Sequence, residues 1–269
     1  MTQTTDNKVS NNRQSDSAIL GQNLSKQYSD KVVLDSLEIE IETGALFALL
    51  GPNGAGKSTL IGILSGVYRP DQGQVRVLGL DPVRSPIDVK RRIGIVPEEL
   101  ALFERLTGLQ QLMFCGRMYG LSAQEARQRA DELLCLTDLK AASSQLIATY
   151  SKGMRRRLAI ATALIHGPSL VFLDEPFDGI DVLAARVIRE LLEELRRKQV
   201  TILLTTHILE IADRLATHAG VLYRGKLQDQ GTKGDLFSRY KCNELETVFQ
   251  RLVPLAEVGP SALSFYDER

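Results

Sequence analysis

The sequence has no excess of charge of either sign and no long hydrophobic run. Its 33 lysines and arginines are balanced by 33 aspartates and glutamates, so the formal net charge is zero. Proteins that bind nucleic acid generally neutralise phosphates with clustered basic side chains, so this balance argues against a nucleic-acid partner. The longest apolar stretches, such as residues 45–50, are far shorter than the roughly 20 apolar residues of a membrane-spanning helix. No membrane span is therefore expected.

Cysteines are few, and the start of the chain lacks the features of a secretory signal. The three cysteines form no Cys-x-x-Cys pair, so we expect reduced, buried thiols in a cytosolic protein. Residues 1–17 are polar and contain no apolar segment, which excludes a secretory signal and is typical of a disordered lead-in. The remaining composition, 43% hydrophobic and 25% charged, is that of an ordinary globular protein.

Three basic runs, at residues 90–92, 155–157 and 196–198, stand out against the balanced charge. No aromatic residues are interleaved with them, as nucleic-acid recognition would favour. We interpret all three runs as solvated helix faces.

Short apolar segments alternate with helical patterns along most of the chain, which predicts an α/β fold. Residues 37–42 alternate apolar and acidic side chains, as in a strand with one buried face, whereas residues 45–50 form an unbroken apolar run. The strands expected from these patterns are residues 37–42, 45–50, 74–78, 93–96, 170–173, 200–205, 220–223 and 226–230.

Helical patterns are concentrated in residues 100–165, which interrupt the α/β alternation. Helices are expected at 107–119, at 122–136 after a capping box, and at 151–166. An amphipathic helix follows the strand at 170–173, and its apolar face is expected to contain Leu183, Val187, Leu191 and Leu195. The tail, residues 241–269, contains a further amphipathic pattern at 244–249 that could pack on its own domain or on a partner.

A glycine-rich segment lies between the apolar run 45–50 and a helical pattern. Residues 51–58 fit the motif G-x-x-x-x-G-K-[ST]. Its glycines let backbone N–H groups surround phosphates, and the helix N-terminus adds partial positive charge. In this motif Lys57 reaches the β- and γ-phosphates and the Ser58 hydroxyl binds Mg²⁺. The segment predicts a site for a nucleoside triphosphate.

The apolar strand at residues 170–173 ends in two carboxylates, Asp174 and Glu175. Asp174 suits a Mg²⁺ ligand acting through water, and Glu175 can accept a proton from an attacking water. His207, which follows the next strand, can donate to the γ-phosphate and hold the water and Glu175 in line. Lys57, Glu175 and His207 are therefore the candidate catalytic residues.

The segment Tyr150-Ser151-Lys152-Gly153-Met154 is similar to Leu-Ser-Gly-Gly-Gln, the signature loop of ATP-binding-cassette (ABC) proteins. With the other motifs, it makes residues 20–240 resemble the ATP-binding subunit of an ABC transporter, of the export-type subfamily whose membrane domains are separate chains. The resemblance implies a P-loop core with an antiparallel β edge, spanning residues 18–240, and an inserted helical subdomain at about 100–165.

The resemblance also implies roles for individual residues. Ser151 and Gly153 would contact the γ-phosphate held by a second subunit, and Asp181 would reach across the same dimer. Tyr28 would stack on adenine, although the pattern alone fits a strand-edge tyrosine equally well. The implied nucleotide-binding residues are Tyr28, Gly51, Pro52, Asn53, Gly54, Ala55, Gly56, Lys57, Ser58, Thr59, Ser151, Gly153 and Asp181.

Three positions depart from the family pattern. Lys152 replaces a glycine and Met154 replaces the glutamine of the signature loop. Glu98 stands where the family places a glutamine that binds Mg²⁺. A carboxylate can also bind Mg²⁺, but it adds negative charge beside a triphosphate. The implied metal ligands are Ser58, Asp174 and Glu98.

The resemblance implies ATP and Mg²⁺ as ligands and two kinds of protein partner. One is a second ABC ATPase subunit, identical or paralogous; the other is an integral-membrane permease docked near residues 98–106. The chain would then lie on the cytoplasmic face of the cell membrane. An ATPase of iron–sulfur-cluster assembly, which also has one cassette of similar length, is the alternative. The identity of a co-purifying partner distinguishes the two.

Overall fold

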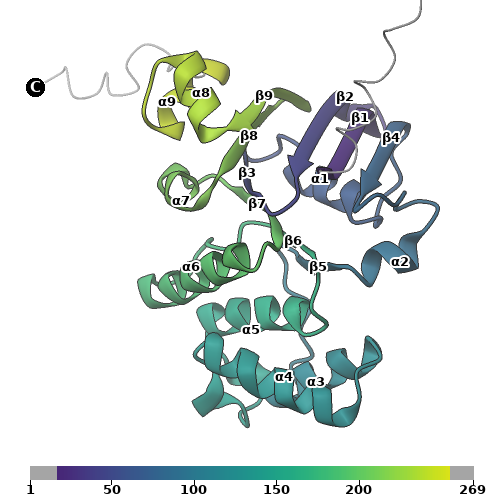
Figure 1. The fold of residues 1–269 in the computed structure, drawn as a ribbon, viewed down its shortest axis with the longest axis vertical. Helices are drawn as coiled ribbons and strands as arrows, with labels where there is room; N and C mark the ends of the chain where they lie inside the picture. The colour runs from purple at the N-terminus through teal and green to yellow at the C-terminus, as the bar shows by residue number, and fades with distance from the viewer. Residues whose placement is uncertain (1–16, 255–269) are drawn as a thin grey trace, which may run out of the picture.

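A six-stranded sheet and a separate three-stranded sheet organise residues 17–254, the part of the chain that the computed structural model describes (Figure 1). The larger sheet has the strand order β5-β6-β7-β3-β8-β9, parallel except for β9, and the smaller antiparallel sheet has the order β2-β1-β4. The strands are β1 (Ser17–Tyr28), β2 (Lys31–Glu42), β3 (Leu46–Leu50), β4 (Gln72–Val77), β5 (Ile93–Val96), β6 (Leu170–Leu173), β7 (Thr201–Thr206), β8 (His218–Tyr223) and β9 (Lys226–Thr232). The α-helices are α1 (Lys57–Leu64), α2 (Pro86–Lys90), α3 (Gly108–Met118), α4 (Ala123–Leu136), α5 (Lys152–Leu164), α6 (Val182–Arg197), α7 (Leu209–Leu215), α8 (Lys233–Tyr240) and α9 (Leu245–Leu252).

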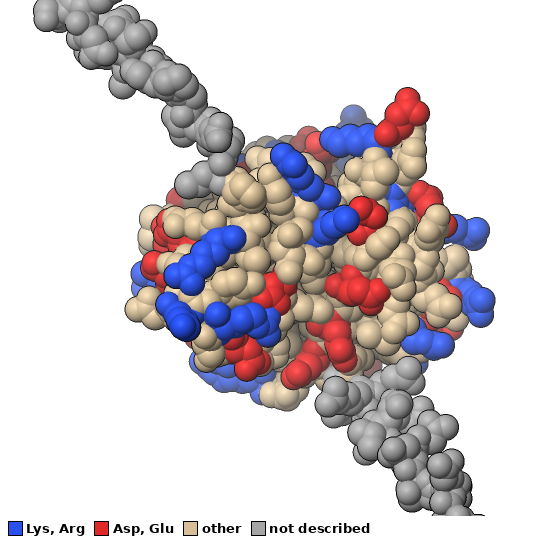
Figure 2. Space-filling view, turned by 90° about the horizontal axis from the view of Figure 1, so that it is seen from above, with Lys and Arg blue, Asp and Glu red and all other residues tan. Residues whose placement is uncertain are grey.

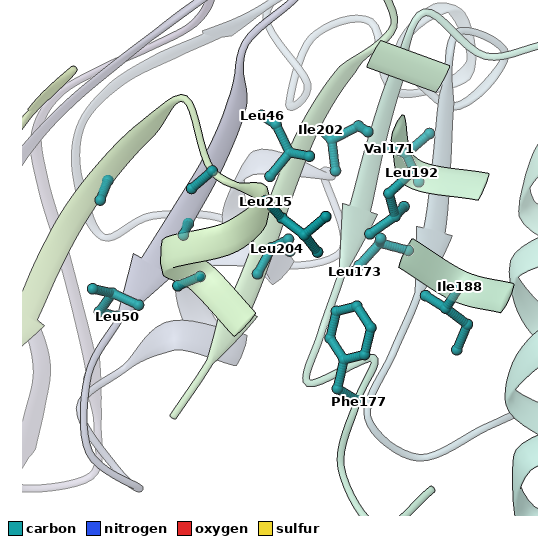
Figure 3. Close-up of a cluster of buried hydrophobic side chains, with 14 of the residues drawn as sticks. Leu46, Leu50, Val171, Leu173, Phe177, Ile188, Leu192, Ile202, Leu204 and Leu215 are labelled. Atoms are coloured by element: carbon teal, nitrogen blue, oxygen red, sulfur yellow. The ribbon is translucent and has the colours of Figure 1, made fainter. Parts of the chain in front are cut away.

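The six-stranded sheet is buried on both faces, as its unbroken apolar strands require. Along β3, Leu46 and Leu50 point into one hydrophobic cluster while Phe47 and Leu49 point into another. The first cluster includes side chains of α5, α6 and α7, among which Figure 3 shows Ile188 and Leu192 of α6 and Leu215 of α7. The second includes α1 and the three-stranded sheet. The two-residue period of the strand thus assigns alternate side chains to the two layers that cover the sheet.

The three-stranded sheet confirms the alternating pattern at residues 37–42. Leu37, Ile39 and Ile41 are buried, and the intervening glutamates are exposed. Strand β1 begins at Ser17, one residue before the boundary expected for the folded domain. The rest of the expected lead-in, residues 1–16, lies outside the described part, as do residues 255–269 of the tail.

The inserted helical subdomain contains α3, α4 and α5, in the lower part of Figure 1. Capping boxes start α3 at Thr107 and α4 at Ser122, the second of which the sequence predicted. Helix α5 packs against both the six-stranded sheet and the helical subdomain. Ile160 lies in the hydrophobic cluster on one face of the sheet, while Leu158 lies in the separate core of the helical subdomain. A movement of α5 would therefore alter the packing of both clusters.

The tail packs on its own domain as far as the structure describes it. Leu245 and Val248 of α9 are buried in the cluster that also includes residues of α7, which decides between the two arrangements left open by the amphipathic pattern. Helices α2 and α8 were not expected. Both are short, and their patterns are too brief to show a helical period.

Two expectations about burial were wrong. Leu183 is 75% exposed, whereas Leu191 is buried as expected, together with Ala184, Ile188 and Leu192 of α6. Residues four apart advance 400° around a helix, so a strict four-residue series drifts off any one face. The cysteines are free but not buried: Cys135 is exposed and the other two are half-buried. Cys135 directly follows the buried Leu134 in α4 and so points about 100° away from the core.

The interpretation of residues 155–157 as a solvated face was also wrong. Arg155 pairs with Glu104 at 2.8 Å, Arg157 donates to the Thr137 carbonyl at 2.7 Å, and Arg156 is only 2% exposed. Consecutive helical residues point about 100° apart. Since α5 is packed between two lobes, three successive side chains cannot all reach solvent.

Among residues 17–254, no helix combines the length and the apolar character needed to cross a membrane. On the face shown in Figure 2, basic and acidic side chains are interspersed rather than separated into patches of one sign.

Candidate functional site

The glycine-rich loop leads directly into α1, and its conformation leaves the helix N-terminus open. Gly54 and Gly56 have φ values of 78° and 109°, in the left-handed region that favours glycine. A Cβ on Gly54 would meet no described atom within 4 Å. No side chain in the described chain caps the N-terminus of α1, and its first turn contains no acidic residue. The uncapped N–H groups and the helix dipole suit an anion such as a phosphate.

Lys57, the first residue of α1, is held inside the loop. Its side chain is buried, and Nζ donates to the carbonyls of Gly51 at 2.8 Å and Pro52 at 3.3 Å. The same Nζ lies 3.3 Å from Oε1 of Glu175. The ammonium group therefore lies between the phosphate loop and the end of β6.

Asp174 and Glu175 follow β6, and both are buried. The hydroxyl of Thr205 in β7 donates to Oδ1 of Asp174 at 2.6 Å and accepts from the backbone N–H of Glu175 at 2.9 Å. Glu175 has a φ of 47°, an uncommon conformation for a residue other than glycine. The neighbouring strand thus fixes both the side chain of the first carboxylate and the backbone of the second.

Glu175 is the centre of a short chain of polar contacts. Its Oε2 lies 3.0 Å from Nδ1 of His207, and its Oε1 lies 3.3 Å from Lys57 Nζ. Oε1 is buried and accepts no hydrogen bond from the described residues. Apart from the ion pair with Lys57, this oxygen has no partner among the described residues, and a carboxylate can accept a proton from water.

These elements enclose a cleft of about 530 Å³. Its walls bring together eleven of the sequence-predicted site residues: Asn53, Gly54, Ala55, Gly56, Lys57, Ser58, Thr59, Glu98, Asp174, Glu175 and His207. Gly51 and Pro52 do not line it but hold Lys57 through their carbonyls. Three further residues, Lys31, Val33 and Asp178, complete the lining.

Negative side chains outnumber positive ones around the cleft. Glu98, Asp174, Glu175 and Asp178 face two lysines, Lys31 and Lys57. Within residues 17–254, no group of three or more His, Cys, Asp or Glu side chains is arranged to hold a metal ion by itself. The donor set therefore fits a Mg²⁺ ion that takes most of its oxygen ligands from a nucleotide and water, with Ser58 and Asp174 as the protein residues that would hold it. Such an ion would neutralise phosphate charge.

Arg156 of α5 lies beneath this acidic wall. Its guanidinium donates to the carbonyls of Pro97 at 3.2 Å and Asp174 at 3.5 Å. Burial lowers the pKa of Arg156, and the negative charge of Asp178 is the strongest influence opposing that decrease. Arginine remains protonated even so, and it places a positive charge behind the carboxylates.

The predicted residues Ser151, Gly153 and Asp181 form a second group outside the cleft. Ser151 is the N-cap of α5 and Asp181 is the N-cap of α6. A Cβ on Gly153 would lie 2.9 Å from the Cβ of Ala184 and 3.2 Å from Oδ2 of Asp181. Only glycine lets the first turns of the two helices approach this closely.

Tyr28 is not brought into the cleft. It is the last residue of β1, the central strand of the small sheet, and its side chain is 44% exposed. Its ring lies edge-to-face with that of Tyr68, with centroids 6.4 Å apart.

Sequence reasoning missed the supporting residues Thr205 and Arg156. Thr205 lies in a β-branched strand and Arg156 lies in a basic run, and neither pattern signals a site. Asp178 had a clearer signal, because it follows Glu175 closely in the chain.

Comparison with known proteins identifies the family. The family model described as ABC transporter matches residues 34–178. The chain belongs to the ABC transporter ATP-binding subunits. It is 40% identical over 235 residues to the daunorubicin resistance ATP-binding protein DrrA3 of Streptomyces coeruleorubidus, covering 87% of this chain and 74% of that protein. It is 43% identical over 222 residues to the Nod factor export ATP-binding protein I of Sinorhizobium fredii, covering 82% of this chain and 64% of that protein.

A solved structure of an ATP binding subunit of an ABC transporter has the same fold. It superposes with a TM-score of 0.81 at 32% identity and covers 87% of this chain and 99% of the other. The resemblance and the fold class inferred from the motifs are therefore confirmed. As an ABC ATPase, the protein belongs to a family that binds ATP, and the cleft beneath the phosphate loop has the groups needed to receive a triphosphate.

Proposed function

We propose that this ABC subunit hydrolyses ATP with Mg²⁺ and thereby powers export through a separate membrane permease. The observation that carries the proposal is the contact chain from Lys57 through Glu175 to His207, with distances of 3.3 and 3.0 Å, at the floor of the nucleotide cleft. A carboxylate held beside a phosphate loop, with one oxygen that accepts no hydrogen bond from the described residues, is suited to activate water rather than merely to bind a nucleotide.

The proposed chemistry is attack of water on the γ-phosphorus of ATP. A bond forms between the water oxygen and the γ-phosphorus, the bond to the β–γ bridging oxygen breaks, and the water proton passes to Glu175. Lys57 and His207 stabilise negative charge on the phosphoryl oxygens and keep the reactants in line. The products are ADP and inorganic phosphate.

Each ATP is proposed to be completed by a second ATPase subunit, either another copy of this chain or a paralogue. The position of Ser151, Gly153 and Asp181 at two helix N-termini outside the cleft supports this arrangement. These groups cannot assist catalysis in the cleft of their own chain from there, whereas a head-to-tail pair would present them to the other subunit's γ-phosphate. Tyr28 is proposed to stack on the adenine.

The permease is proposed to dock beside residues 98–106 and the helical subdomain, on the cytoplasmic face of the membrane. A groove of about 250 Å³ with a largely apolar lining, including Leu100, Leu102 and Tyr119, lies between β5, α3 and α5. Beside it, the exposed rings of Phe103 and Phe114 pair edge-to-face at 5.4 Å. Export is favoured because the relatives are named for drug resistance and Nod factor export.

The test has two parts. The purified chain should release phosphate from Mg²⁺-ATP at a rate that rises more than linearly with protein concentration, because two subunits form each site. A pull-down from detergent-solubilised membranes should recover a polytopic membrane protein. Absence of phosphate release, both from the chain alone and from the complex recovered with its partners, would refute the ATPase assignment. Recovery of a soluble iron–sulfur scaffold instead of a membrane protein would refute the transport assignment.

A further inference from the structure

Lys152, the residue that departs from the glycine of the family signature, has a specific partner. Its Nζ lies 3.2 Å from Oδ2 of Asp178. The lysine side chain also extends over Gly179, where an added Cβ would lie 2.0 Å from Nζ. Gly179 therefore leaves the space through which Lys152 reaches the loop after β6.

Asp178 belongs to the nucleotide cleft. It lines the cleft, and its backbone N–H donates to the carbonyl of Glu175 at 3.2 Å. Its carboxylate is thus fixed in a turn that starts at the proposed base. An uncompensated charge at this position would repel an incoming triphosphate.

Helix α5 provides positive charge on two sides of Asp178. Lys152 and Arg156 are four residues apart, so they lie on the same face of α5. Lys152 forms the ion pair, and Arg156 is buried beneath the cleft with its charge coupled to that of Asp178. The cleft lining by itself has four carboxylates and two lysines, and the two residues of α5 compensate that excess.

We propose that Lys152 is a determinant of nucleotide affinity in its own subunit, because it neutralises Asp178 at the edge of the cleft. This inference rests on the proposed ATP site and extends it to a residue outside the cleft. The signature segment then has two partners: its backbone and Ser151 face a second subunit, while the Lys152 side chain acts on the cleft of its own chain.

The test is equilibrium binding of a fluorescent ATP analogue with Mg²⁺ to the full chain, at a concentration where sedimentation shows a monomer. Lys152→Ala should weaken binding about two- to five-fold, the range expected for loss of one exposed ion pair. Asp178→Asn combined with Lys152→Ala should restore the affinity, because the repulsive charge is then absent. Lys152→Arg, which keeps the charge, should bind as the parent does.

Lys140→Ala is the matched control. It removes another lysine–aspartate pair, between the exposed Lys140 and the half-buried Asp131 at 2.5 Å, in the helical subdomain. Asp131 keeps its pair with Arg127, and the variant should not alter nucleotide affinity. The inference is wrong if Lys152→Ala binds as tightly as the parent, if Asp178→Asn does not suppress its defect, or if Lys140→Ala has the same defect. Thermal unfolding of every variant identifies any loss of fold, and Lys152→Gln replaces Lys152→Ala if the alanine variant unfolds.

Binding and hydrolysis are measured separately, so the two proposals can fail separately. A parent chain that binds the analogue but releases no phosphate, alone or in the complex recovered with its partners, refutes the ATPase assignment. The charge inference is then decided by the binding data alone.

Discussion

The two groups of candidate site residues differ in how they are held. In the cleft, Glu175 contacts both Lys57 and His207, and Thr205 fixes the strand end that carries the carboxylates. In the group at the helix N-termini, the hydrogen bonds that the structure shows for the polar side chains stay within one helix: Ser151 accepts from Met154, and Asp181 from Ala184.

In the proposed mechanism, this difference separates chemistry that one chain can organise from chemistry that requires two. The residues that line the cleft come from five separate segments of the chain, so their arrangement is a product of the tertiary fold. Ser151 and Asp181 are fixed by local capping, which orients them before any partner arrives. The first group is expected to determine the chemical step, and the second to determine whether it proceeds in a dimer.

The strongest test of the cleft is Glu175→Gln. The amide keeps the shape of the side chain but cannot accept the proton, so phosphate release should fall by a factor of about 10²–10⁴. ATP binding should persist and closed dimers should accumulate, as gel filtration with ATP can show. Hydrolysis at the parental rate would remove Glu175 from the proposed mechanism.

The corresponding test of the second group is Ser151→Ala. It removes the hydroxyl proposed to donate to the other subunit's phosphate, so hydrolysis should fall at least about tenfold. ATP affinity of the monomer should stay at the parental value, since Ser151 lies outside its own cleft. Loss of the cap should lower the free energy of unfolding by about 1 kcal/mol.

Ser122→Ala is a close control for this variant. Ser122 caps α4 and accepts from Glu125 at 3.2 Å, the same distance as from Ser151 to Met154. It should lose similar stability but retain hydrolysis. Equal losses of hydrolysis in the two variants would show that Ser151 acts only as a helix cap and not at the phosphate.

A smaller effect is expected for Thr205→Val, which keeps the shape of the side chain. The buried Asp174 and the Glu175 N–H each lose a hydrogen-bond partner, which should cost about 1–3 kcal/mol of unfolding free energy. Displacement of the two carboxylates should slow hydrolysis about tenfold. Denaturant unfolding and phosphate release measure the two effects.

Thr201→Val, at the other end of β7, distinguishes a loss of folding stability from a displacement of the two carboxylates. Thr201 is also fully buried and accepts from the Gly44 N–H at 2.9 Å. Its replacement should reduce stability to a similar extent and leave hydrolysis intact. If both variants hydrolyse ATP equally, Thr205 has no positioning role.

The same contrast explains how much could be read from the sequence. The phosphate loop and the acidic strand end are contiguous segments, and strands β5 and β6 have the expected bounds because their apolar runs are short and sharply ended. Local motifs therefore predicted the cleft and the family.

Residues that act through tertiary contacts could not be recognised in this way. Nothing in a basic run distinguishes Arg156, which α5 buries beneath the carboxylates, from Arg196, which remains exposed. The contact of Lys152 with Asp178 likewise joins positions 26 residues apart. Such partners depend on how α5 packs between the two lobes.

The smallest expected effect is that of Glu98→Gln, at the edge of the cleft. Glu98 lines the cleft but is exposed, so water screens its charge. Removing one negative charge near the triphosphate should lower the ATP concentration for half-maximal hydrolysis about twofold, with the maximal rate little changed. Titrating Mg²⁺ at fixed ATP gives the second measurement: if the carboxylate is a metal ligand, Glu98→Gln should require more Mg²⁺. A variant that needs more of both ATP and Mg²⁺ would show that ligation outweighs repulsion at this position. A variant identical to the parent in both titrations, and in stimulation by the permease, would show that Glu98 acts at neither the metal nor the docking groove.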